Sequence, residues 1–229
     1  MKQYGTLYLV ATPIGNLSDI TLRALEILRQ VDFVICEDSR RSGLLLKHFE
    51  IKKPFKTFHE HTSDSKKGFI LEEIQKGHNA AFITDAGTPL VSDPGYDLVQ
   101  DAIRAGIEIQ SIPGPSAFVS ALILSGLPSH AFTLIGYLPQ KEKARKHALQ
   151  KLIDEPRTLI FYESPYRVIK CLKDMLEVFG DRPASASKEL TKKFEQTIRG
   201  KLSDMISGLS AGKILGEWVI VVHGKESHD

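Results

Sequence analysis

The stretch AAFITDAGTP, residues 80–89, runs from an apolar segment directly into a loop that contains glycine and proline. Two other stretches repeat this order: apolar residues 7–11 precede TPIGN (12–16), and the largely apolar residues 107–112 precede PGPSA (113–117). A helix-like segment follows each loop. In a parallel sheet, this order puts all three loops at the carboxyl ends of strands, where open α/β folds bind ligands. The three loops together predict an α/β fold that carries a binding site.

The rest of the first half alternates in the same way between predicted strands and predicted helices. We expect strands at residues 4–11, 33–36, 80–84 and 107–112. We expect helices at residues 19–30, 43–49, 63–76, 96–105 and 116–125. This alternation is typical of a mostly parallel sheet with helices on both faces.

The alternation of predicted strands and helices is interrupted at residues 126–129 (GLPS). We interpret these residues as a linker between one domain at residues 1–126 and another at residues 127–229. In the second domain, the predicted strands are residues 132–137, 157–162, 184–189, 195–198 and 218–222. The predicted helices are residues 141–153, 166–179 and 202–209. The two strands near residues 184–198 have no helix between them, which predicts a mixed sheet. The fold class is therefore α/β with two lobes, an N-terminal mostly parallel sheet and a C-terminal mixed sheet.

The composition argues against several classes of protein. The 229 residues carry a formal net charge of only +2, so the chain as a whole is not a polybasic nucleic-acid binder. No apolar run approaches the length that spans a membrane, and the first residues lack a signal-peptide pattern. Two cysteines, Cys36 and Cys171, are too few for a disulfide framework or a structural zinc site. We therefore expect buried thiols and a cytoplasmic protein.

Positive charge gathers in a few segments, above all in residues 141–151. Lys141 and Arg145 are four residues apart, which places them on one face of the predicted helix. Such a patch can bind the phosphates of RNA. The alternative is an ordinary solvated helix face.

The three loops differ from the common phosphate-binding loops. None has the pattern that binds a nucleoside triphosphate, and TPIGN lacks the three glycines of a dinucleotide site. A phosphate-bearing cofactor is therefore disfavoured. Asp85, at a strand end among backbone amides, suits a cationic or hydroxyl-rich ligand, and an adenosyl group attached to a sulfonium has both properties. The alternative is that Asp85 serves the turn alone, because aspartate is common in turns.

The sequence His59-Glu60-His61 contains two histidines, a residue type that often binds metals. Histidines separated by one residue lack the one-face spacing of the helical zinc motif, and no third ligand is close in sequence. We therefore expect no metal, and interpret His59 as part of a loop that contacts substrate.

Six short motifs occur in a fixed order along the chain. They are TPIGNLSDIT (12–21), EDSR (37–40), DAGTP (85–89), PGP (113–115), FYES (161–164) and KELTK (188–192). Together they resemble the tetrapyrrole methylase superfamily, and within it the ribosomal small-subunit RNA (cytidine-2'-O)-methyltransferase I branch. The resemblance runs from about Gly5 to about Gly224. Ser39 departs from the usual threonine of the family but keeps the hydroxyl group.

The resemblance implies a two-domain α/β fold with S-adenosylmethionine (SAM) bound between the domains, and a homodimer. It also implies transfer of a methyl group to the ribose 2'-hydroxyl of a cytidine in 16S rRNA of the small ribosomal subunit. Methylases of tetrapyrrole rings usually carry a glycine-rich first loop and a Gly-Gly-Asp-Pro type of middle loop. The corresponding residues here read PIGN and AGTP, which favours RNA as the substrate. The alternatives are a tetrapyrrole or other small molecule as methyl acceptor, and a non-catalytic ribosome-assembly factor.

Candidate roles follow for individual residues. By position in the motifs, the residues expected to bind SAM are Pro13, Gly15, Asp85, Gly87, Thr88, Val91, Ser116, Ala117, Tyr162 and Leu190. The residues expected to contact substrate RNA are Arg40, His59, Lys141, Arg145 and Arg167. Glu163, Lys188 and Glu189, at predicted strand ends, are the catalytic candidates, either as a base or as a charge that stabilises the developing alkoxide. For these three, the alternative is a structural ion pair or a helix cap.

Overall fold

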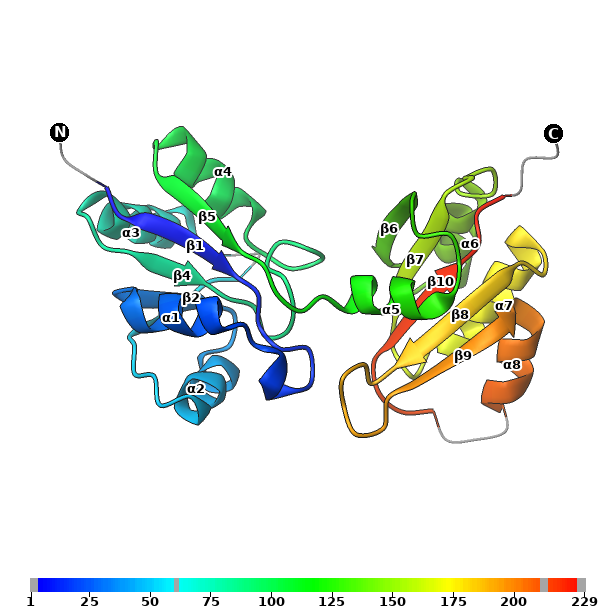
Figure 1. Ribbon diagram of the computed structural model, residues 1–229. Helices are drawn as coiled ribbons and strands as arrows, with labels where there is room; N and C mark the ends of the chain where they lie inside the picture. The colour runs from blue at the N-terminus through cyan, green and yellow to red at the C-terminus, as the bar shows by residue number, and fades with distance from the viewer. Residues whose placement is uncertain (1–3, 60–61, 211–213, 226–229) are drawn as a thin grey trace. The chain divides into compact units, whose positions relative to one another are not determined.

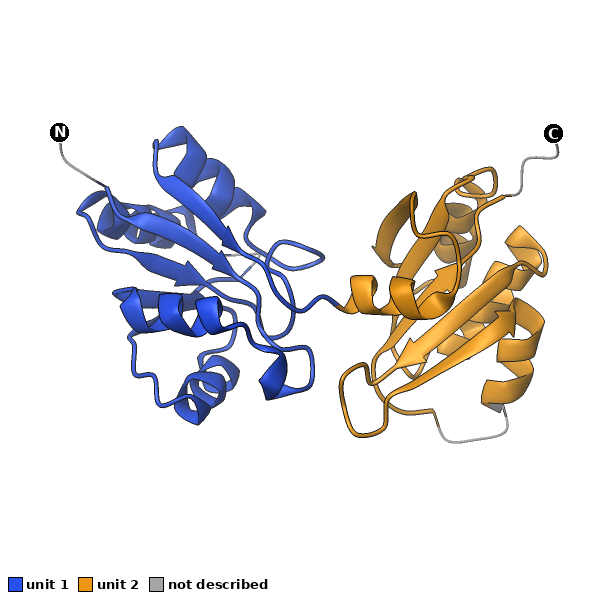
Figure 2. Cartoon of the chain, in the orientation of Figure 1, with its two compact units in different colours: residues 1–116 blue, residues 117–229 orange. Residues whose placement is uncertain are grey.

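The computed structural model describes residues 4–59, 62–210 and 214–225. The chain divides into two compact units, Met1–Ser116 and Ala117–Asp229, which are described separately (Figure 2).

The first unit is built on a five-stranded sheet in the order β3-β2-β4-β1-β5. Its strands are β1 (Thr6–Val10), β2 (Phe33–Cys36), β3 (Phe55–Thr57), β4 (Ala80–Phe82) and β5 (Glu108–Ile112). All of them run parallel, which confirms the predicted parallel sheet. Strand β3 is not among the predicted strands, because three half-buried residues are too few to show a period.

Helices cover both faces of this sheet (Figure 1). The helices on one face are α1 (Leu22–Gln30) and α2 (Ser39–His48), and those on the other are α3 (Asp64–Gln75) and α4 (Tyr96–Arg104). Helix α1 begins three residues later than predicted, after the 3₁₀ turn η1 (Leu17–Asp19). The reason is that Thr21 caps α1, its hydroxyl accepting a hydrogen bond from the Ala24 N–H at 3.1 Å.

The second unit contains a five-stranded sheet in the order β6-β7-β10-β8-β9. Its strands are β6 (Phe132–Tyr137), β7 (Thr158–Glu163), β8 (Pro183–Lys188), β9 (Gln196–Lys201) and β10 (Trp218–Val222). Strands β6 and β7 pair in parallel, and the other pairs are antiparallel, which confirms the predicted mixed sheet. In this arrangement β6, β7 and β8 run in one direction, so their carboxyl ends lie at one edge of the sheet.

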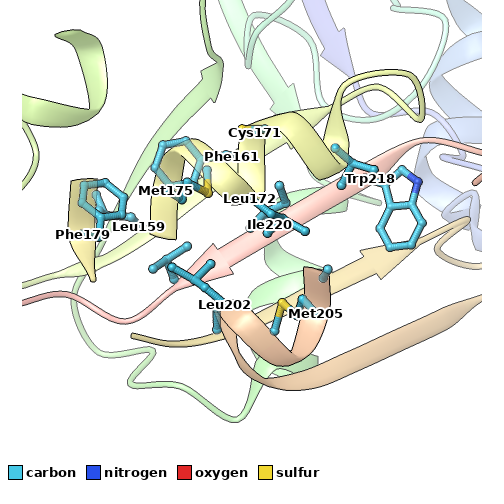
Figure 3. Packing of buried hydrophobic residues seen from close by; sticks show 14 of the residues in the cluster. Leu159, Phe161, Cys171, Leu172, Met175, Phe179, Leu202, Met205, Trp218 and Ile220 are labelled. Carbon is cyan, nitrogen blue, oxygen red and sulfur yellow. The ribbon is translucent and has the colours of Figure 1, made fainter. Parts of the chain in front are cut away.

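The core of the second unit lies between this sheet and the helices α6 (Glu142–Gln150), α7 (Val168–Phe179) and α8 (Leu202–Ser210). Phe161 and Trp218 from the sheet pack with Leu172 and Met175 from α7 (Figure 3). Burial of such a side chain stabilises the fold by about 1.5–3 kcal/mol. No helix of the described residues is long and apolar enough to cross a membrane.

Helix α5 (Ala117–Ser125) lies on the opposite face of the second sheet (Figure 1), where it packs against β7, β8, β9 and β10. The carbonyl of Leu124 accepts a hydrogen bond from Arg199 Nε of β9 at 2.7 Å. From the sequence, α5 is predicted to belong to the first domain, with the division after residue 126. Because α5 packs on the second sheet, the two units divide after Ser116 instead.

Both cysteines are buried, as predicted. Burial raises the pKa of the Cys36 and Cys171 thiols above the usual value.

Candidate functional site

Three loops meet at the carboxyl edge of the first sheet. The Thr12 N–H donates to the Gly87 carbonyl at 2.9 Å, and the Gly87 N–H donates to the Thr12 carbonyl at 3.0 Å. The Thr88 hydroxyl donates to the Pro115 carbonyl at 3.2 Å. The loops after β1, β4 and β5, which are distant in sequence, are therefore tied together by hydrogen bonds.

The loop after β4 has an unusual backbone. Gly87 has a φ of +91°, in the region that favours glycine, and Leu90 and Ser92 have φ of 70° and 64°. Left-handed residues other than glycine cost on the order of 1–3 kcal/mol each and concentrate at functional sites. Half-buried Val91 lies between the two strained residues. This loop has the conformation expected of a ligand-binding segment.

The predicted SAM residues of the first unit differ in what they can offer a ligand. Pro13 is buried and Gly15 is exposed. The backbone N–H and carbonyl of Gly87 are both engaged with Thr12, so Gly87 shapes the loop rather than contacting a ligand through those groups. Asp85, Thr88 and half-buried Ser116 keep partly accessible side chains, and Ala117 begins α5 in the second unit.

Negative charge concentrates beside these loops. Burial, followed by the charges of Glu37 and Asp85, raises the pKa of Asp93 to about 6. Arg41 Nη1 lies 3.2 Å from Asp85 Oδ2, whereas Asp85 Oδ1 is buried and has no hydrogen-bond partner among the described residues. A buried acceptor of this kind favours a ligand that brings a donor or a positive charge.

A polar pocket of about 500 Å³ lies at the ends of β2, β3 and β4. It brings together Arg40, His59 and Asp85, which are separate in sequence. The Arg40 guanidinium holds Asp38 Oδ2 at 3.0 Å and lowers the pKa of that carboxyl to about 2. Of the motif His59-Glu60-His61, only His59 lies within the described residues. The described residues contain no group of three or more histidine, cysteine, aspartate or glutamate side chains that could hold a metal.

Two charged residues of this edge, Arg41 and Asp93, are not among the predicted site residues. Arg41 follows Arg40 directly, and only the phase of α2 decides which arginine reaches Asp85. For Asp93, the available signal is the turn sequence Ser92-Asp93-Pro94-Gly95 in the same loop.

Two of the catalytic candidates, Glu163 and Lys188, flank Trp218 of the intervening strand β10 at the carboxyl edge of the second sheet. Trp218 pairs with Glu163 across β7 and with Lys188 across β8, so the three side chains share one face of the sheet. Lys188 Nζ lies 5.7 Å from the centroid of the Trp218 ring and forms no ion pair within the described residues. No carboxylate of the described residues therefore offsets the positive charge of Lys188.

Glu163 is paired with Arg167. Its side chain is 0% exposed, and its Oε1 lies 2.7 Å from Arg167 Nη2 and accepts a hydrogen bond from the Ser164 N–H at 2.7 Å. Arg167 Nη1 also donates to the Leu138 carbonyl at 3.5 Å. The contacts favour the alternative of a structural ion pair, in which Glu163 orients Arg167 instead of touching substrate.

Glu189 is also held in place. It has a φ of 50°, and its Oε1 accepts hydrogen bonds from Lys192 Nζ at 3.0 Å and from the Glu217 N–H at 3.3 Å. Leu190 is buried. Tyr162 precedes Glu163 and therefore faces the opposite side of the sheet, where its ring centroid lies 5.5 Å from that of Tyr137.

The basic helix α6 requires a correction. Lys141 is exposed, as expected of a phosphate contact. Arg145 is instead 3% exposed, with Nη2 2.6 Å from Asp174 Oδ2 and Nη1 donating to the Gln140 carbonyl at 2.9 Å. Arg145 is therefore an internal structural residue, because the guanidinium is already bound and covered.

A profile of the family described as Tetrapyrrole (Corrin/Porphyrin) Methylases matches residues 6–206 of this chain. The chain belongs to the tetrapyrrole methylase family.

Within the tetrapyrrole methylase family, full-length relatives carry the name Ribosomal RNA small subunit methyltransferase I. The relative from Thermotoga maritima is 45% identical, and the match covers 97% of this chain and 100% of the relative. The relative from Haemophilus influenzae is 46% identical, over 98% of this chain and 81% of the relative. The predicted branch of the family is thereby confirmed.

Solved structures of tetrapyrrole methylases share the fold. A cobalt precorrin-4 methyltransferase aligns with a TM-score of 0.69 at 19% identity, over 95% of this chain and 94% of that chain. A uroporphyrin-III-C-methyltransferase from Thermus thermophilus aligns with a TM-score of 0.63 at 21% identity, over 96% and 92%. At these identities the similarity supports the α/β fold and carries no information about the substrate.

Proposed function

We propose that the protein transfers the methyl group of SAM to the ribose 2'-hydroxyl of a cytidine in 16S rRNA of the small ribosomal subunit. The observation that carries this proposal is the match of 45% identity over the full length of a relative named Ribosomal RNA small subunit methyltransferase I. The predicted RNA-type loops, PIGN and AGTP, support the same substrate. The proposal includes a cytoplasmic homodimer.

The residues of the first unit fit SAM. The cofactor supplies a methyl group bound to a positively charged sulfur. Asp85 Oδ1, buried without a partner among the described residues, can accept a hydrogen bond from an amino or hydroxyl group. The nearby carboxylate Glu37 adds negative charge that favours a cation. In the proposal Asp85, Thr88 and Val91 hold the cofactor, and Gly87 fixes the loop.

The second unit supplies positive charge for the methyl acceptor. A ribose hydroxyl is a weak acid, so a cation near its oxygen stabilises the alkoxide that develops during transfer. Of the three catalytic candidates, Glu163 is bound to Arg167 and Glu189 to Lys192, whereas Lys188 has no ion pair within the described residues. We therefore assign the stabilising charge to Lys188, and the orientation of Arg167 toward an RNA phosphate to Glu163.

Methyl transfer to small ribosomal subunits that lack their native methylations tests the proposal. Labelled SAM should leave its label in a 2'-O-methylcytidine after digestion of the 16S rRNA. Lys188→Met should lower the rate at saturating SAM on the order of 100-fold, as expected for loss of one stabilising charge. Lys173→Met, at an exposed lysine of α7 outside the basic segment 141–151, serves as the matched control. Absence of label despite measured SAM binding would contradict the proposal and point to a small-molecule acceptor.

A further inference from the structure

The connection between β8 and β9, residues 189–195, presents an aromatic side chain to solvent. Phe194 is 71% exposed, although phenylalanine is usually buried. Lys193 Nζ lies 5.7 Å from the centroid of the Phe194 ring. We propose that Phe194 and Lys193 form a stacking site for an unpaired base of the substrate RNA. The inference rests on the proposed function, since it names a contact to the same substrate.

The connection is held in a defined shape. Glu189 and Thr191 have φ of 50° and 64°, and the Lys192 N–H donates to the Glu189 carbonyl at 2.9 Å. The Glu195 N–H donates in turn to the Lys192 carbonyl at 3.1 Å. A side chain on a preorganised turn loses little further freedom on binding, which favours affinity.

The charge of this segment favours an anionic partner. Residues 188–201 contain five basic and two acidic side chains. Both acidic groups are used inside the turn, because Glu189 binds Lys192 at 3.0 Å and Glu195 Oε2 accepts a hydrogen bond from the Thr191 N–H. Lys193 forms no ion pair in the described part of the chain, so its charge faces outward beside the ring.

The position of the connection links it to the methyl acceptor. It follows Lys188 directly, at the carboxyl edge of the second sheet where Glu163 and Arg167 also lie. Proteins that bind single-stranded RNA combine a basic surface with aromatic rings on which bases stack. An exposed ring with a lysine beside it, close to Lys188, matches this combination better than an apolar protein interface, which is depleted in lysine.

Phe194→Ala tests the inference. Base stacking on an aromatic ring predicts a loss of affinity of roughly 5- to 150-fold for small subunits that lack their native methylations. Phe194→Trp should keep wild-type affinity, because it retains a stacking surface. Phe69→Ala is the matched control: Phe69 is also an exposed phenylalanine, with Lys56 Nζ 4.2 Å from its ring centroid, but it lies on α3. Calorimetric SAM affinity should be unchanged in all three variants.

Two results would overturn the inference: Phe194→Ala binding the subunits as tightly as the wild type, or Phe194→Ala altering only the oligomeric state in sedimentation experiments. The second result would identify the ring as a protein contact. If the wild-type protein transferred no methyl group to subunits that lack their native methylations, the proposed function would instead be refuted. Because subunit binding is measured without methyl transfer, the two failures are distinguishable.

Discussion

Removal of the Arg145 guanidinium tests whether Arg145 stabilises the second unit from inside or contacts RNA from the surface of helix α6. Arg145→Met leaves the aliphatic volume but removes the groups that lie 2.6 Å from Asp174 Oδ2 and 2.9 Å from the Gln140 carbonyl. Asp174 is 6% exposed and would remain buried. Its only other ion-pair partner among the described residues is Lys146, with Nζ 3.7 Å from Asp174 Oδ1.

The expected loss of stability is large for one side chain. Removal of one partner from a buried ion pair destabilises a protein by about 3–5 kcal/mol, because the other charge stays buried without compensation. Since Lys146 still lies near Asp174, we expect the lower end, about 3 kcal/mol, and a fall in Tm of roughly 10 °C. Arg145→Met combined with Asp174→Leu should recover most of this loss, because no uncompensated charge remains.

Thermal unfolding followed by circular dichroism measures the loss of stability. Filter binding to RNA tests the alternative role of Arg145, a contact with phosphate. Lys141→Ala, at an exposed position on the same helix segment, should keep the wild-type Tm and weaken RNA binding in a salt-dependent way. The structural role of Arg145 would be contradicted if Arg145→Met kept the wild-type Tm and weakened RNA binding as much as Lys141→Ala. Such a result would mean that Arg145 contacts phosphate from the surface.

Two further predictions concern the first unit. Since the pKa of Asp93 is raised from 3.8 to about 6, the folded state binds the proton more tightly than the unfolded state, and stability rises as pH falls from above 6 toward 3.8. Asp93→Asn should therefore raise Tm at pH 7.5 and flatten the pH dependence of Tm between these values; an unchanged pH profile would contradict the assignment. Gly87→Ala, at a φ of +91°, should weaken SAM binding in calorimetry, while Gly180→Ala, at a φ of +76° with open space for a Cβ, should lose stability by a similar amount and bind SAM normally. Equal SAM affinity in both variants would mean that the loop containing Gly87 is not part of the cofactor site.

The sequence predicts the first sheet well because three apolar segments end in distinctive loops. Strand β3 lacks such a signal, since Phe55–Thr57 are only half-buried and stand next to no glycine. Helix α5 shows a different limit. Its residues are almost all apolar, so their pattern fits either unit, and only the packing against β8 and β10 assigns it to the second.

Charged residues were predicted less well than loops. A basic run in the sequence does not tell which lysine or arginine has a carboxylate partner from another helix, and Asp174 lies 29 residues from Arg145. Glu163 illustrates the same point, because its position at a strand end predicts a catalytic group, whereas its partner Arg167 comes four residues later, at the end of the turn that precedes α7. Whether a charged residue forms an internal ion pair or contacts substrate depends on which residues lie beside it in the fold. The periodicity of the sequence does not give this information.

The two units hold their candidate functional residues by different interactions, and this difference fits the ligand proposed for each unit. In the first unit, backbone hydrogen bonds between Thr12 and Gly87 fix the loops, so the geometry there does not depend on charge. In the second unit, ion pairs such as Glu163–Arg167 and Glu189–Lys192 orient the residues around Lys188. A small cofactor requires a fixed shape, which backbone contacts provide. A polyanionic substrate requires oriented positive charge, which ion pairs provide, and which salt weakens where the pairs reach solvent.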